Sequence, residues 1–189
     1  MKKNHSFLPV TLFCLGMMFF LNLYQTVTPS HSASAEEIDI RVTAALERFH
    51  NEVGGSKDFL NQAKGVLIFP KVIKAGIGIG GEYGEGALQI KGKTVDYYST
   101  ASASIGFQLG AQAKTIIIVF LKEDALKSFR NSSGWEVGVD GSVALVSVGA
   151  GGTIDTTNIK DPIVAFIFGQ KGLMYNLTIE GSKLTKIAR

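Results

Sequence analysis

Residues 63–88, AKGVLIFPKVIKAGIGIGGEYGEGAL, decide the fold of this 189-residue chain. The segment starts with the apolar run 66–69, which Pro70 follows, and continues into six glycines: Gly76, Gly78, Gly80, Gly81, Gly84 and Gly86. Glycine permits positive φ angles and close backbone approaches, although it loses the most conformational entropy on folding. Such a cluster beside an apolar strand predicts either a tight corner in a sheet or a backbone cradle for a ligand.

Two nucleotide-binding motifs are matched only in part. Gly76, Gly78 and Gly81 have the GxGxxG spacing, but the dinucleotide motif needs a strand directly before it and a helix opening from it. The sequence GEYGEG that follows is a poor start for a helix. Gly92-Lys93-Thr94 resembles the end of a phosphate-binding loop, but Ala87 stands where that loop needs its first glycine. A hairpin turn explains this tripeptide better.

The first 35 residues have the layout of a secretory signal peptide. Lys2 and Lys3 precede an apolar segment at about residues 7–24, and the small residues 33–35 precede Glu36. The apolar segment is too short and interrupted for a typical membrane-spanning helix. We expect cleavage between Ala35 and Glu36, and a periplasmic or secreted protein that is peripheral on a membrane.

Composition narrows the class of the remaining 154 residues. Removing Lys2 and Lys3 leaves 17 of the 19 basic side chains against 16 acidic ones, a formal charge of +1, and no block of like charges. Nucleic acid is therefore not an expected partner. The only cysteine lies within the first 35 residues, so disulfides and thiolate metal sites are excluded after cleavage. Residues 36–189 suit a single domain with its own core.

The pattern along residues 36–189 predicts an α+β fold. Apolar residues at three- and four-residue spacing predict an amphipathic helix over 36–53 and a third helix over 122–130, and Ser56 is the expected N-cap of a short second helix between them. The rest reads as short strands: 66–69, 87–90, 95–98, 102–109, 115–121, 135–139, 142–148, 163–168 and 173–179. Turns are expected at 91–93, 170–172 and 180–182. We therefore predict a mainly antiparallel, barrel-like or sandwich sheet with the amphipathic helix and one or two short helices packed on it.

Catalytic and metal-binding patterns are sparse. His50 is the only histidine after residue 35, and a lone histidine in an amphipathic helix is usually a plain helix residue. Glu82 and Glu85 lie close enough in sequence to act as a general acid and base, although paired surface carboxylates are far more common. No GxSxG motif occurs. We expect no enzyme, no cofactor and no metal.

Binding is the remaining chemistry. Lys64, Lys71 and Lys74 bracket the apolar strand and the start of the glycine run, and Ile77 and Ile79 lie within that run. Exposed glycine backbone can offer N–H groups to anions, while lysines add charge and isoleucines can contact acyl chains. The alternative is a tight sheet corner with ordinary solvated lysines.

Five blocks along the chain together resemble the SYLF domain, also known as the Ysc-type actin-binding domain. They are AKGVLIFP…KAGIGIGGEYGEG, YYSTASASIGFQLGAQAKTIIIVFL, ALKSF, GVDGSVALVSVGAGG and IVAFIFGQKGLMYNLTIEGSKL, within residues 42–187. One departure is Tyr97-Tyr98-Ser99, where the family pattern has a tryptophan or aromatic–serine step.

The resemblance implies a non-catalytic module that binds membrane phospholipids, with phosphoinositides and actin as ligands of eukaryotic relatives. For an exported, bacterial member we expect anionic phospholipid at a membrane surface of the cell envelope, and we do not expect actin. The site residues expected from the sequence are Lys64, Lys71, Lys74, Ile77, Ile79 and the six glycines. Two other functions stay open: a structural protein of the envelope that self-assembles into oligomers, and an enzyme that uses Glu82 and Glu85.

Overall fold

The glycine-rich segment forms part of one of two unusually long strands. The computed structural model describes residues 32–147, 159–172, 179 and 181–189, and within these it leaves out the side chains of residues 77, 78 and 104–109. Strand β1 (Gly65–Ile90) pairs antiparallel with β2 (Lys93–Phe120) from Gly65↔Phe120 to Ile90↔Lys93. Both turn residues, Lys91 and Gly92, have positive φ angles (51° and 74°), as the commonest two-residue hairpin turn requires.

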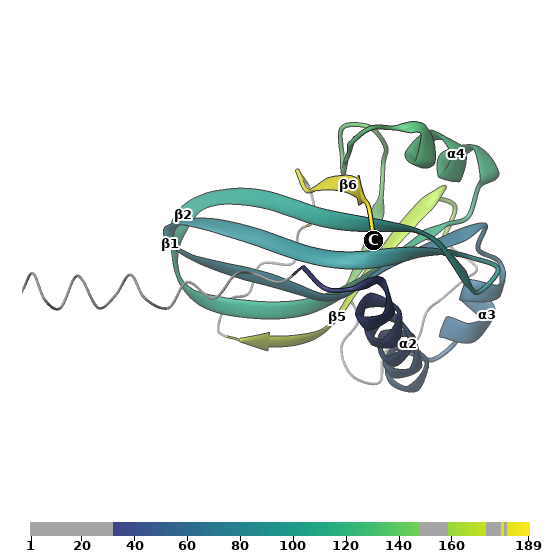
Figure 1. The fold of residues 1–189 in the computed structure, drawn as a ribbon, viewed down its shortest axis with the longest axis horizontal. Coiled ribbons are helices and arrows are strands. Elements are labelled where there is room, and N and C mark those ends of the chain that lie inside the picture. Colours follow the sequence, from purple (N-terminus) through teal and green to yellow (C-terminus); the bar gives the residue numbers. More distant parts are fainter. Residues whose placement is uncertain (1–31, 148–158, 173–178, 180) are drawn as a thin grey trace, which may run out of the picture. The chain divides into compact units, whose positions relative to one another are not determined.

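This long hairpin folds back on itself near its middle. A β-carbon added at Gly86 would overlap the carbonyl oxygen of Ile68, and one added at Gly84 would lie 2.9 Å from that of Lys71. Two parts of β1 that are far apart along the strand therefore touch backbone to backbone. The hairpin bends back around residues 76–80. There the strand register shifts, and a β-carbon at Gly76 would overlap the Cα atom of Gly80. Figure 1 shows both ribbons curving back at the end of the molecule that carries their labels.

The other strands complete a mixed, mainly antiparallel sheet. Strand β5 (Ile163–Gly172) pairs antiparallel with the C-terminal part of β2, and β6 (Lys183–Ile187) pairs antiparallel with residues 97–101 of β2. Strand β3 (Trp135–Glu136) joins β6, and β4 (Ala144–Ser147) lies parallel to β5. The order is β3-β6-β2-β5-β4, with β1 along the other side of β2.

Within the described residues, three helices pack on the part of the hairpin that lies away from its bend. They are α2 (Ala35–Glu52), α3 (Ser56–Asn61) and α4 (Glu123–Asn131). Helix α2 begins with a capping box, because the Ser34 hydroxyl accepts from the Glu37 N–H while the Glu37 carboxylate accepts from the Ser34 N–H. Its apolar residues Ile38, Val42, Ala45 and Phe49 are all buried. Figure 1 shows α2 lying against the sheet. Residues 33–189 form one compact unit.

The sheet separates two apolar cores. The first lies inside the folded hairpin and under α4, and it includes Leu67, Leu88, Ile116, Phe129 and Trp135. The second lies under α2 and α3, where Phe49 packs 5.2 Å from both Phe166 and Phe168, measured between ring centroids. Alternate residues of 116–120 enter opposite cores, so this apolar run is covered on both faces, as the sequence predicted.

The α+β fold, the mainly antiparallel sheet and the packed helices are confirmed, while several local predictions were wrong. Pro70 does not end the first strand, because β1 continues through a register shift between Phe69 and Val72. Residues 170–172, predicted as a turn, belong to β5 and pair with β2. Ser56 is the first residue of α3 and is buried, with Gly55 as the cap. Most of the strand predicted over 173–179 lies outside the described residues.

Candidate functional site

The inside of the folded hairpin becomes polar towards its bend at residues 76–80. Five polar side chains are buried between the apolar core and the bend. We call them the inner polar cluster: Lys74, Glu82, Thr100, Gln112 and Lys114. The Lys114 ammonium lies 3.0 Å from the Glu82 carboxylate, and both side chains are almost fully buried. One oxygen of Glu82 and the amide oxygen of Gln112 have no hydrogen-bond partner within the described part of the chain. Polar groups therefore occupy a position that an apolar core usually fills.

The outside of the same part of the hairpin is apolar and exposed. Ile79 is 72% exposed, Tyr83 52% and Ile73 46%, and small residues lie between them. The exposed apolar set, here named the bend surface, consists of Ile73, Ala75, Ile79, Tyr83, Ala101, Ala103 and Ala111. Because paired residues in a sheet point to the same side, these side chains lie in rows on the outer face of β1 and β2. The bend surface wraps around the fold of the hairpin.

Exposed lysines stand at the ends of two of these rows. Ile73 pairs with Ala113, which pairs with Lys171 of β5. Tyr83 pairs with Ala101, which pairs with Lys183 of β6. Both lysines are exposed. The bend surface is therefore an apolar surface bordered by positive charge.

The structure does not bring the lysines predicted from the sequence together. Lys64 is exposed just before β1, and its backbone N–H donates to the carbonyl of Phe120. Lys71 is exposed on the outer face, whereas Lys74 is buried at 7% exposure inside the fold. Ile79 lies on the bend surface, and the side chain of Ile77 lies outside the description. The lysines and isoleucines predicted to form one lipid-binding site therefore lie in three separate parts of the molecule.

The glycines act mainly where two backbones meet. Gly76, Gly84 and Gly86 each face another part of β1 so closely that a β-carbon would clash. Gly80 supplies the atom that Gly76 approaches, while Gly81 has open space where its side chain would be. Gly78 belongs to the same strand between them. Of the two interpretations that the sequence left open, the geometry favours the corner in a sheet.

Glu82 and Glu85 cannot work as an acid–base pair, which corrects one of the sequence-based alternatives. Residues three apart in a strand point to opposite faces, so Glu82 points inward to Lys114. Glu85 points outward, accepts from the Tyr83 hydroxyl at 2.7 Å and pairs with Arg189 at 2.5 Å. Within the described part of the chain, no three His, Cys, Asp or Glu side chains gather as metal ligands.

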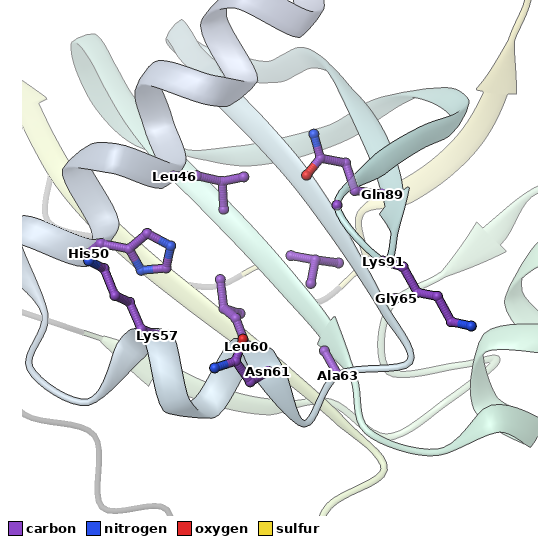
Figure 2. A pocket seen from close by; sticks show the side chains of 11 residues that line it. Leu46, His50, Lys57, Leu60, Asn61, Ala63, Gly65, Gln89 and Lys91 are labelled. Atoms are coloured by element: carbon purple, nitrogen blue, oxygen red, sulfur yellow. The ribbon is translucent and has the colours of Figure 1, made fainter.

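A pocket opens at the other end of the hairpin, beside the turn. It has a volume of about 510 Å³ and lies between α2, α3, the start of β1 and the Lys91-Gly92 turn. We call it the turn-end pocket; its lining includes Leu46, Leu60, Ala63, Val66, His50, Lys57, Asn61, Gln89 and Lys91. Figure 2 shows Leu46 and His50 reaching down from α2, Leu60 and Asn61 rising from α3, and Gln89 closing the opposite side.

His50 is the titratable group most affected by this pocket. Burial, and then the nearby positive charge of Lys57, lower the pKa of His50 below its usual 6.5. Its Nδ1 atom lies 3.2 Å from the buried Ser56 hydroxyl at the start of α3. His50 thus links α2 to α3 and is largely neutral at pH 7. The sequence alone gave no reason to connect it with Lys57 or with the hairpin turn.

Among the described helices, none combines the length and apolar character needed to cross a bilayer. The apolar face of α2 is also already covered by the sheet. Ile40 is the one large apolar residue of α2 that stays exposed, at 62%.

A protein-family model matches the second half of the chain. Residues 101–188, from the middle of β2 to the end of β6, match the family Ysc84, described as Las17-binding protein actin regulator. A search of curated proteins finds no match. The matched residues contain four of the blocks that resemble the SYLF domain, in whole or in part, while the glycine-rich block precedes them. This match supports the assignment of the chain to the Ysc84, or SYLF-domain, family, which is a family of binding domains.

Proposed function

We propose that this chain is a non-catalytic lipid-binding module that attaches to a membrane surface through the bend surface. The observation that carries the proposal is the reversal of polarity around the fold of the hairpin. There the polar side chains lie inside, and Ile73, Ile79 and Tyr83 face outward. An exposed apolar surface of this kind is a common sign of a membrane or protein contact.

The composition of the surface suits the interfacial region of a bilayer. Its small alanines let the sheet lie close to the acyl chains, and Tyr83 combines an apolar ring with a polar hydroxyl that favours the headgroup level. Burying a largely exposed isoleucine such as Ile79 contributes about 2 kcal/mol. Contact through several such residues gives binding that is reversible and peripheral.

The bordering lysines favour anionic phospholipids. Lys71, Lys171 and Lys183 are exposed on the outside of the sheet beside the apolar rows. Each lysine close to an anionic membrane contributes about 1 kcal/mol, and salt weakens this contribution. Because residues 36–189 carry a formal charge of only +1, long-range attraction is small and the local arrangement of lysines decides the preference.

The cellular setting of the proposal follows from the N-terminal segment. A chain that is exported and cleaved after Ala35 acts in the periplasm or outside the cell, where it meets envelope phospholipids and no cytosolic actin. The family description mentions actin regulation, and we do not extend this activity to the present chain.

Vesicle co-sedimentation with residues 33–189 tests the proposal. We expect binding to vesicles of phosphatidylglycerol and phosphatidylcholine, with weaker binding to phosphatidylcholine alone and at high salt. Ile79→Asp places a charge on the bend surface and should weaken binding at least tenfold. Ile40→Asp, a matched change at a similarly exposed isoleucine of α2, should leave binding unchanged.

Lysine variants test the charge contribution separately. Lys171→Glu with Lys183→Glu should weaken binding to anionic vesicles at least tenfold and should remove most of the salt dependence. Lys122→Glu with Lys127→Glu changes the net charge equally at exposed positions around α4 and should have a much smaller effect.

Two results would overturn the proposal. One is equal binding by the Ile79→Asp variant and the unchanged protein. The other is a concentration-dependent oligomer that forms without lipid, dissociates in the Ile79→Asp variant and does not sediment with vesicles. The second result would assign the bend surface to self-assembly, the structural function that the sequence left open.

A further inference from the structure

The turn-end pocket is separate from the bend surface. The bend surface surrounds residues 76–80 in the middle of the hairpin, whereas the pocket is bordered by Gly65 and Val66 at its start and Gly92 at its turn. The two sites share no residue. A ligand of the pocket can therefore be tested independently of membrane attachment.

The pocket has the size and lining of a small-molecule site. Its volume of about 510 Å³ falls within the range of roughly 300–1,000 Å³ typical of such sites. Leu46 from α2, Leu60 from α3, and Ala63 and Val66 from the start of the hairpin provide an apolar wall. In Figure 2 the side chains of Leu46, Leu60 and Ala63 point into the same space. This wall suits an alkyl chain.

The charged groups of the pocket all have the same sign. Lys57 and Lys91 contribute positive charges from opposite sides, while Asn61 and Gln89 contribute amides. Among the described lining residues there is no carboxylate. After burial, the positive charge of Lys57 is the second cause of the lowered pKa of His50, so this charge acts on the imidazole. This arrangement favours an anion.

We propose that the turn-end pocket binds a single-chain anionic amphiphile, with its alkyl chain against Leu46, Leu60 and Val66 and its anionic head beside Lys57 and His50. The chain length is limited by the pocket, so a medium-length fatty acid or a lysophospholipid tail fits better than a two-chain lipid. The head lies close enough to His50 to affect its protonation. Lys91 lines the other side of the pocket, and in Figure 2 its ammonium points away from the space between Leu46 and Leu60.

Calorimetric titration of residues 33–189 with sodium laurate below its micellar concentration tests the proposal. We expect one laurate bound per chain. Dodecyl maltoside and dodecyltrimethylammonium have an alkyl chain of nearly the same length with a neutral or cationic head, and each should bind at least tenfold more weakly. These two detergents distinguish a site for an anionic amphiphile from a general affinity for alkyl chains.

Two variants address the two halves of the site. Lys57→Glu should weaken laurate binding at least tenfold because it reverses the charge beside the head group. Ala63→Phe should abolish binding because the ring fills the apolar part of the pocket. Lys127→Glu, an equal charge change on the exposed side of α4, is the control and should bind laurate normally.

His50 provides an independent readout. It is the only histidine in residues 33–189, so its ring signals can be followed by NMR as the pH changes. The charged groups that line the pocket with it are Lys57 on α3 and Lys91 at the turn. A bound carboxylate should raise the pKa of His50, whereas dodecyl maltoside should leave it unchanged.

The outcomes separate this proposal from the proposed membrane attachment. Laurate binding that is lost in the folded Ala63→Phe variant, while that variant still sediments with vesicles, supports the pocket. Equal laurate binding by Ala63→Phe and the unchanged protein, or an unchanged pKa of His50 in the presence of laurate, would overturn it. The vesicle results with Ile79→Asp do not depend on either outcome.

Discussion

Gly86 is the residue on which the folded hairpin depends most directly. Any side chain there would overlap the backbone of Ile68, whereas Gly81, five residues earlier in the same run, has open space. The two glycines look alike in sequence but differ in what surrounds them. Only Gly86 is required by the close packing of two backbone segments.

Alanine substitution should reveal this difference. We expect Gly86→Ala to lower the free energy of unfolding by about 3 kcal/mol or more, because the clash is with backbone that cannot rotate away. Gly81→Ala should change it by no more than about 0.5 kcal/mol. Urea denaturation of both variants measures the two values, and equal losses would contradict the assignment of Gly86 to a close backbone contact.

The buried Lys114–Glu82 ion pair offers a second test at the residue scale. Glu82→Gln removes the carboxylate 3.0 Å from the buried ammonium and should cost about 3–5 kcal/mol of stability, since breaking a buried pair leaves a charge without that partner. The double variant Glu82→Leu, Lys114→Met should recover most of the loss. A double variant whose loss equals or exceeds the sum of the losses in the Glu82→Leu and Lys114→Met single variants would show that the pair is not coupled as the geometry indicates.

At the scale of elements, the sequence predicted the helices and the turn well. The spacing of Ile38, Val42, Ala45 and Phe49 predicted α2, and Gly92 with its flanking strands predicted the hairpin turn. These features depend on residues close together in sequence. The length of β1 and β2 could not be predicted, because Pro70 and the glycines normally interrupt strands and here occupy a register shift and a fold.

The candidate site was harder to predict than the elements. Val72, Ile73 and Lys74 alternate in the usual way along β1, but sequence does not indicate which face will be inside. The apolar Ile73 faces outward and the charged Lys74 inward, because the hairpin folds around the face that carries Lys74. Lys171 and Lys183 reach the site only through pairing between distant strands. The positions of Lys171 and Lys183 beside the bend surface therefore depend on pairing between distant strands, which local sequence patterns do not reveal.

The capping box of α2 makes a prediction about processing. Cleavage between Ala35 and Glu36 would remove Ser34, whose hydroxyl and N–H form the box with Glu37. A chain of residues 36–189 should therefore be less stable than one of residues 33–189 by about 1 kcal/mol. Thermal denaturation of both chains measures the difference, and intact mass of the exported protein shows which N-terminus the cell produces. Equal stability would show that the box contributes nothing.

The contact of His50 with α3 predicts a pH dependence. The pKa of His50 is lowered in the folded protein, so the unfolded chain, with a pKa near 6.5, takes up a proton first as the pH falls. Stability should therefore be complete above about pH 6.5 and should decrease as the pH falls through the lower, folded pKa. Urea denaturation at pH 7.5 and 5 should show this loss, and His50→Gln should reduce it. An identical loss in the variant would assign it to carboxylates.

For the whole molecule, the folded hairpin explains how one small domain can hold the two proposed sites apart. Helices α2 and α3 cover the sheet near the turn and create the turn-end pocket, while the other end of the hairpin keeps its apolar outer face exposed. The family match covers β5, β6 and the C-terminal part of β2, and it supports a binding function. The central claim is that the exposed end contacts the bilayer.

Fluorescence quenching by brominated phospholipids tests this claim most directly. Tryptophan is introduced as Ile79→Trp on the bend surface or as Ile40→Trp on α2, and Trp135, which is 2% exposed, gives a constant background. On anionic vesicles, bromine on the acyl chains should quench the Ile79→Trp variant strongly and leave the Ile40→Trp variant unaffected. Membrane-bound protein in which Ile79→Trp is not quenched, or is quenched less than Ile40→Trp, would contradict the account.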